Sequence, residues 1–115
     1  MAPEQEGKQY VTPEIDKRQH RRANLITQVR CDALQRQGLM VTRDISVGGM
    51  FVIEKNPFPA DSEVNTMFRL EPTSDLLTCR GKVAYAIKGM GMGISFVDLS
   101  DEVRQALQKY VDEAA

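Results

Sequence analysis

The segment KRQHRRANL, residues 17–25, gathers positive charge just before the first apolar run of the chain. Arg18 and Arg22 are four residues apart in it, and His20 and Arg21 lie between them. A guanidinium group is a rigid planar fork that binds phosphate oxygens two at a time, stacks on a base, or binds the O6/N7 edge of guanine. Cations crowded in this way repel one another. The segment therefore indicates a local site for an anion, although the whole chain has a formal net charge of −1.

A second group, DISVGG, combines polar residues and glycines between two segments of strand-like composition. The carboxylate of Asp44 can accept hydrogen bonds from the N1–H and the exocyclic amine of guanine, and the hydroxyl of Ser46 can donate and accept. Gly48 and Gly49 allow the backbone to approach a ligand closely or to adopt a positive φ. Each group alone also has a simpler interpretation: the first as a solvated charged segment, the second as ordinary turn chemistry.

The elements that would position these residues follow from the hydrophobic pattern. Alternation with a period of two predicts short strands separated by turn-forming residues. The predicted strands are residues 24–32, 39–45, 50–53, 64–70, 77–88 and 93–98. In the first strand, the residues expected to share one face are Leu25, Thr27, Val29 and Cys31. In the fifth, they are Leu77, Cys79, Val83, Tyr85 and Ile87.

The end of the chain changes to a period of three to four residues, which is typical of an amphipathic helix. Apolar residues recur at this spacing from Val103 to Ala114. Ser100 is a suitable N-cap, and Asp101 and Glu102 follow in the first turn, where the helix dipole favours them. Short strands followed by one helix favour an antiparallel sandwich or barrel over a parallel sheet.

The composition fits one domain, with 42% apolar and 27% charged residues. The sequence contains neither the roughly 18 apolar residues of a membrane-spanning helix nor the apolar region of a secretory signal. Cys31 and Cys79 are expected to be reduced, buried thiols of a cytoplasmic protein. With one histidine, His20, and no closely paired cysteines, no metal or cofactor is expected. No set of nucleophile, base and orienting group is visible either, so the sequence does not predict an enzyme.

In this order and at this distance, R-x-x-x-R before the first strand and D-x-S-x-x-G in the next hairpin resemble the motifs of the PilZ domain family. Downstream, GMGISFVDLSDEVRQALQKYV is similar to the closing G-[IV]-x-F strand and C-terminal helix of that family. The resemblance covers about residues 16–113. It implies a mainly β fold, a six-stranded antiparallel β-barrel of the split PilZ type with a C-terminal α-helix. Residues 16–115 would form this domain, and residues 1–15 a flexible N-terminal arm.

PilZ domains are bacterial receptors for the second messenger cyclic di-guanylate (c-di-GMP), so the resemblance also implies a ligand and a site. The residues implied to bind c-di-GMP are Arg18, Arg22, Asp44, Ser46 and Gly49, with Arg21 and Gly48 as additional candidates. The arginines would bind phosphates and guanine edges, and the aspartate and the serine would fix a guanine. The last glycine of the motif would leave room for the ligand.

These inferences give the hypothesis of a non-enzymatic receptor that changes conformation on binding c-di-GMP and signals to an unidentified effector protein, as a monomer or a homodimer. The alternative within the same fold is a protein–protein interaction adaptor that binds no nucleotide. A barrel for single-stranded nucleic acid is disfavoured, because few aromatic residues are available for base stacking. Neither DNA binding nor membrane insertion is expected, and an enzyme is the least favoured class.

Overall fold

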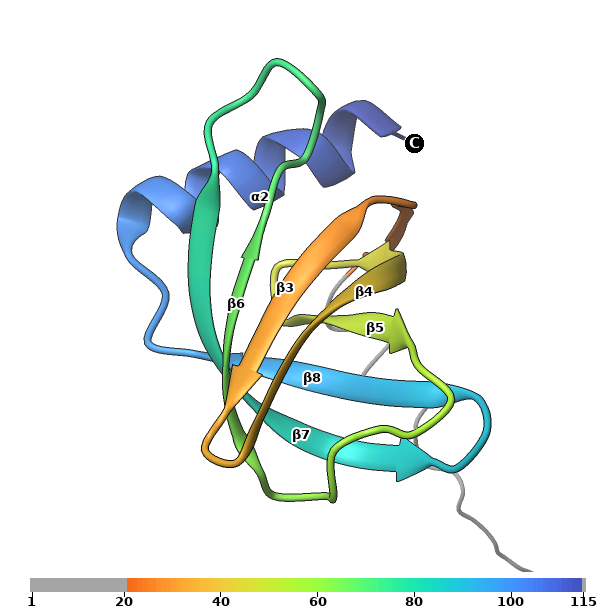
Figure 1. The fold of residues 1–115 in the computed structure, drawn as a ribbon. Helices are drawn as coiled ribbons and strands as arrows, with labels where there is room; N and C mark the ends of the chain where they lie inside the picture. Colours follow the sequence, from red (N-terminus) through yellow and green to blue (C-terminus); the bar gives the residue numbers. More distant parts are fainter. Residues whose placement is uncertain (1–20, 115) are drawn as a thin grey trace, which may run out of the picture.

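The computed structural model describes residues 21–114, which fold into strands and one C-terminal helix (Figure 1). The strands are β2 (Ala23–Asn24), β3 (Gln28–Ala33), β4 (Arg36–Ile45), β5 (Gly49–Ile53), β6 (Glu63–Phe68), β7 (Leu77–Ile87) and β8 (Gly91–Val97), and the helix is α2 (Asp101–Ala114). Buried and exposed residues alternate along β6, because one face of the strand packs inward and the other meets solvent. The predicted arm, residues 1–15, lies outside the described residues.

Strands β3 to β8 close into an antiparallel barrel. Hydrogen-bonded neighbours follow the order β4-β3-β6-β7-β8-β5, and β5 pairs back onto β4. The short strand β2 precedes β3 in the chain and pairs with the last residues of β4, so β2 extends β3 along the same neighbouring strand. These pairings confirm the prediction of a mainly β, six-stranded antiparallel barrel followed by one helix.

The first predicted strand is divided into β2 and β3 by a bulge. Residues 25–27 stand between the two strands, opposite only two residues of β4, Thr42 and Arg43. Thr42 is fully buried and fills this irregularity. Its hydroxyl accepts a hydrogen bond from the N–H of Thr27 at 3.1 Å and donates one to the carbonyl of Leu25. This one side chain therefore supplies hydrogen-bond partners that a regular ladder would have supplied.

Replacing Thr42 with valine is expected to lower the free energy of unfolding by about 1–3 kcal/mol, because valine keeps the volume but leaves a buried N–H and carbonyl without this partner. Urea denaturation followed by circular dichroism measures the change. Thr78, which is exposed on β7, supplies the control, and Thr78→Val should change the stability by less than about 0.5 kcal/mol. Equal effects of the two substitutions would contradict the role given to Thr42.

A second bulge, in strand β7, changes which of its side chains point into the barrel. Its register with β8 shifts between Val83 and Tyr85, so that Ala84 is an extra residue. Val83 is fully buried, whereas Tyr85 and Ile87 are 49% and 43% exposed. The prediction that Tyr85 and Ile87 share the side of Cys79 and Val83 is therefore wrong. Side chains alternate along a strand, so one inserted residue moves all the later ones to the other face.

The barrel interior and helix α2 share one hydrophobic core, and Figure 1 shows the helix lying across one end of the barrel. The buried residues of this core are Leu25, Val29, Cys31, Met40, Ile45, Met50, Val52, Phe58, Val64, Phe68, Cys79, Val83, Met92, Ile94 and Leu107. The helix begins as predicted, because the hydroxyl of Ser100 accepts a hydrogen bond from the N–H of Val103 at 3.2 Å. No helix within residues 21–114 is long and apolar enough to cross a membrane.

Both cysteines are free and buried in the core, which confirms their interpretation as small buried thiols. Burial raises the pKa of Cys31 from 9.0 to about 12, with a smaller contribution from the carboxylate of Asp32, and burial raises the pKa of Cys79 to about 12. The thiolate is the reactive form, so we expect neither thiol to react with a disulfide reagent at about pH 8 until urea unfolds the protein. Absorbance of the released thiolate follows the reaction, and fast reaction without urea would contradict the buried positions.

The same pKa values predict a loss of stability in alkali. A thiol in the unfolded chain loses its proton near pH 9.0, whereas in the folded chain it keeps the proton up to about pH 12. The folded state thus binds more protons in this range, and its stability should fall as the pH rises above about 9. Urea denaturation at several pH values, compared with a Cys31→Ala, Cys79→Ala variant, isolates this contribution.

Candidate functional site

The two sequence motifs meet where β2 pairs with the end of β4. Asn24 stands opposite Asp44 in this pairing, and Arg22, just before β2, reaches the same carboxylate. The Nε of Arg22 donates to Oδ1 of Asp44 at 2.7 Å, and its Nη2 lies 2.6 Å from the same oxygen. Its Nη1 donates to Oγ of Ser46 at 3.5 Å. The fold thus brings an arginine of the first motif to the aspartate and the serine of the second.

The structure describes three of the other predicted site residues, and the fourth lies outside the described part of the chain. Arg21 is exposed and adjoins Arg22 in the chain. Gly48 lies in the loop that follows Ser46, and Gly49 is the first residue of β5. Arg18 lies outside the described residues, so its place in the site stays a prediction.

Arg43 belongs to this group and was missed by the sequence analysis. Its Nε donates to Oδ2 of Asp44 at 2.8 Å, so both oxygens of one carboxylate accept hydrogen bonds from guanidinium groups. The side chain of Asp44 is only 15% exposed, against 38% for Arg22 and 54% for Arg43. Neighbouring side chains of a regular strand point to opposite faces. Here the register of β4 with β5 shifts between Thr42 and Asp44, and this bulge lets Arg43 and Asp44 meet.

An aromatic platform lies beneath Arg43 on the outside of the barrel. The guanidinium carbon of Arg43 is 4.0 Å from the centroid of the Phe51 ring, a cation–π distance. Phe51 alternates with Met50 and Val52 of the core, so its ring points outward, yet it is only 2% exposed. The ring of Tyr85 stands 6.3 Å from it. Arg43 is therefore held by stacking on one side and by the carboxylate at its edge.

The loop between β4 and β5 is fixed by its own hydrogen bonds. The N–H of Ser46 donates to the carbonyl of Gly49 at 2.8 Å, and the N–H of Gly48 donates to Oγ of Ser46 at 3.1 Å. The N–H of Phe96 in β8 donates to the carbonyl of Gly48 at 2.9 Å. Ser46 is 1% exposed, so in this structure its hydroxyl holds the loop and contacts Arg22. Direct contact of this hydroxyl with a guanine stays a prediction.

The fold itself requires a glycine at position 49, independently of any ligand. A Cβ atom at this position would lie 2.1 Å from the carbonyl oxygen of Ile94. The backbones of β5 and β8 approach closely here, where Gly49 pairs with Ser95. Only a residue without a side chain fits between them. The implied function of Gly49, leaving room for a ligand, stays a prediction.

The site is joined to the C-terminal helix through β2. The hydroxyl of Tyr110 in α2 donates to the carbonyl of Asn24 at 2.9 Å, and Asn24 is the residue that pairs with Asp44. Arg22 comes two residues before Asn24 in the chain. A displacement of Arg22 would therefore act on a strand that α2 holds by a hydrogen bond.

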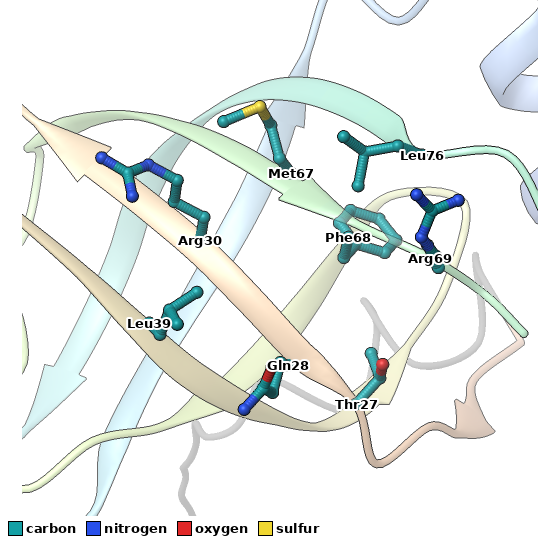
Figure 2. A pocket seen from close by; sticks show the side chains of 8 residues that line it. All are labelled: Thr27, Gln28, Arg30, Leu39, Met67, Phe68, Arg69 and Leu76. Carbon is teal, nitrogen blue, oxygen red and sulfur yellow. The ribbon is translucent and has the colours of Figure 1, made fainter. Parts of the chain in front are cut away.

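A separate hollow of 360 Å³ lies on the surface of β3, β4 and β6 (Figure 2). Its lining residues are Thr27, Gln28, Arg30, Leu39, Met67, Phe68, Arg69 and Leu76. None of the predicted site residues in the described chain is among them. The hollow is thus distinct from the place where the two motifs meet.

The group around Asp44 is suited to an anion that carries a hydrogen-bonding edge. Two guanidinium groups face one carboxylate, which leaves an excess of positive charge for phosphate. Their planes can also stack on a purine, and the carboxylate can accept from two adjacent donors. Guanine presents such a pair of donors, N1–H and the exocyclic amine. The arrangement is therefore chemically suited to an anionic ligand with a planar ring and two adjacent hydrogen-bond donors.

Similarity to solved structures identifies the fold. With the motility inhibitor MotI (DgrA) of Bacillus subtilis the TM-score is 0.74 at 17% identity, over 83% of this chain and 49% of that chain. With the PilZ domain of YcgR from Escherichia coli, solved with c-di-GMP, the TM-score is 0.69 at 12% identity, over 85% of this chain and 91% of that domain. With PlzA of Borreliella burgdorferi, in complex with c-di-GMP, the TM-score is 0.65 at 15% identity, over 86% of this chain and 44% of PlzA. The chain thus spans about half the length of MotI and PlzA.

Sequence comparison gives the family. No curated protein is similar enough in sequence to count as a relative of this chain. The model of the PilZ domain, however, matches residues 16–113, which include both motifs and all of helix α2 except its last residue. With that match over most of its length, and with a barrel similar to that of solved PilZ domains, the chain belongs to the PilZ domain family.

Proposed function

We propose that this protein is a non-enzymatic receptor that binds c-di-GMP and signals to an effector protein. The observation that carries the proposal is the convergence of Arg22, Asp44 and Ser46 at one point of the barrel surface. The PilZ domain of YcgR and the protein PlzA, which share the fold, have been solved with c-di-GMP, and this supports the same ligand here. PilZ domains are known as receptor domains without enzymatic activity, which agrees with a binding function.

Binding of a guanine at Asp44 requires an exchange of hydrogen bonds. Oδ1 already faces Nε and Nη2 of Arg22, Oδ2 accepts from Arg43, and guanine adds two more donors. A carboxylate has only about four acceptor positions, so a guanine binds when Arg22 gives up its contacts with Asp44 and turns toward phosphate or the O6/N7 edge. Charge-assisted hydrogen bonds contribute about 1.5–3 kcal/mol each, and micromolar binding needs about 8 kcal/mol net. Two arginine forks together with base stacking would have to supply this net value after the cost of association is subtracted.

A signal would pass from the site to helix α2. When Arg22 leaves Asp44 for the ligand, it pulls on β2, and β2 is tied to α2 by the hydrogen bond from Tyr110 to Asn24. The surface around this contact would therefore differ between the free and the bound protein. If an effector protein binds this surface in only one of the two states, its binding depends on whether c-di-GMP is bound.

Isothermal titration calorimetry tests the proposed function. We expect saturable binding of c-di-GMP with a Kd in the micromolar range or below. Cyclic di-AMP is the matched control ligand, because it carries the same phosphates but lacks the N1–H and the amine that Asp44 would bind. It should bind at least about tenfold more weakly. No saturable heat with c-di-GMP would contradict the proposal.

One observation favours a second candidate function, an interaction adaptor that binds no nucleotide. Val41 of β4, Ile53 of β5 and Ile87 of β7 form one cross-strand row on the outside of the barrel, with Gly91 between the last two. They are 39%, 47% and 43% exposed, so an apolar surface faces solvent there. If calorimetry detects no binding of c-di-GMP to this protein, the adaptor becomes the favoured function.

A further inference from the structure

We propose that Arg43 is a third arginine of the binding site, stacking on the guanine that Asp44 binds. The inference rests on the proposed function, since it names a further contact to the same ligand. Arg43 lies outside both sequence motifs, and its place in the site follows from the bulge in β4. The geometry at Asp44 and Phe51 carries the argument.

Arg43 is preorganised for contact with a planar ligand. Its guanidinium carbon lies over the ring of Phe51, 4.0 Å from the centroid, and its Nε donates to Asp44 at 2.8 Å. The side chain is nevertheless 54% exposed, so more than half of it remains accessible to a ligand. A guanidinium group that is already ordered loses little conformational entropy on binding.

The position of Arg43 relative to Asp44 indicates which part of the ligand it contacts. Arg43 binds Oδ2 of Asp44, so once Arg22 has turned toward the ligand, a guanine held at Asp44 by its N1–H and amine lies next to the guanidinium group of Arg43. Arg22 reaches Ser46 and the loop as well, whereas Arg43 is backed by an aromatic ring. A guanine on Arg43 would complete a stack of base, guanidinium and Phe51.

Another arginine of the same strand provides a matched control. Arg36 pairs with the carboxylate of Glu54 at 3.0 Å, and its guanidinium carbon lies 5.1 Å from the centroid of Phe58. It therefore makes the same two kinds of contact as Arg43, with a carboxylate and a buried phenyl ring. Arg36 is the first residue of β4, at the opposite end of the strand from Asp44. Its replacement tests whether loss of such contacts alone affects binding.

Calorimetry with c-di-GMP on variants tests the inference. Arg43→Ala should weaken binding about tenfold, and Arg43→Lys should weaken it to a similar degree, because lysine keeps the charge but has no flat face to stack. Arg36→Ala should bind within about twofold of the wild type. Arg43→Ala and Arg43→Lys variants that both bind like the wild type would overturn the inference.

A measurement on the unaltered protein does not depend on folding of a variant. In an NMR titration with c-di-GMP, we expect NOEs from the guanine protons to the side chain of Arg43, which a role through Asp44 alone would not produce. The Nε–H signal of Arg43 should shift, and that of Arg36 should stay. Binding without any contact to Arg43 would overturn this inference and leave the proposed function intact, whereas a protein that does not bind c-di-GMP contradicts the proposed function itself.

Discussion

Replacing Asp44 with asparagine is expected to weaken binding of c-di-GMP by roughly 150-fold, equivalent to about 3 kcal/mol. The substitution removes the charge and turns one acceptor oxygen into an NH₂ group, which faces a donor of the guanine. It also removes the negative charge that fixes Arg22 and Arg43 in place. Calorimetry measures the affinity, and circular dichroism shows whether the variant remains folded.

The matched control for this prediction is Glu54→Gln. Glu54 accepts from Arg36 as Asp44 accepts from Arg43, and its side chain is 21% exposed, close to the 15% of Asp44. Its substitution removes a similar ion pair without touching the site, so the affinity should stay within about twofold. An Asp44→Asn variant that binds as well as Glu54→Gln would show that Asp44 does not bind the guanine.

Replacing Gly49 with alanine is expected to cost about 3 kcal/mol or more of unfolding free energy, and to prevent stable folding if the protein is of ordinary marginal stability. The new Cβ atom would lie 2.1 Å from the carbonyl oxygen of Ile94, and the obstacle is backbone rather than a movable side chain. Strands β5 and β8 would have to separate, and β5 is the strand through which the barrel closes onto β4. Urea denaturation measures the loss.

Gly38 is the control glycine, because it also lies in a strand but has space for a methyl group. A Cβ atom there would meet only Cε of Met40, at 3.7 Å. Gly38→Ala should therefore leave the stability unchanged or raise it by up to about 1 kcal/mol, since alanine restricts the unfolded chain. Equal stability of the two alanine variants would contradict the structural role assigned to Gly49.

The fold could be predicted from the sequence because its main features are local. The alternation of apolar residues defines strands such as β6, and the change of period at Ser100 defines the start of α2. Closure into a barrel came from the resemblance to the PilZ family, since the partners of a strand are not visible in its own pattern. The match over residues 16–113 and the pairing of β5 with β4 agree with it.

The errors arise from bulges, which depend on pairing between strands. Ala84 shifts the register of β7, so Tyr85 and Ile87 lie outside instead of inside. A bulge is set by the neighbouring strand, and no residue type in the sequence of β7 marks it. The bulge in β4 likewise brings Arg43 to Asp44, and a strictly alternating strand would have separated them. The sequence could therefore name the motif residues but not the third arginine beside them.

The most direct measurement is a crystal structure of the protein with c-di-GMP. We expect a guanine whose N1 and exocyclic amine lie about 3 Å from the carboxylate oxygens of Asp44, with Arg22 on a phosphate or on the O6/N7 edge of a guanine. A nucleotide bound elsewhere, such as in the hollow lined by Leu39 and Met67, would contradict it. So would a nucleotide that leaves Arg22 and Asp44 paired with each other and without contact to the ligand.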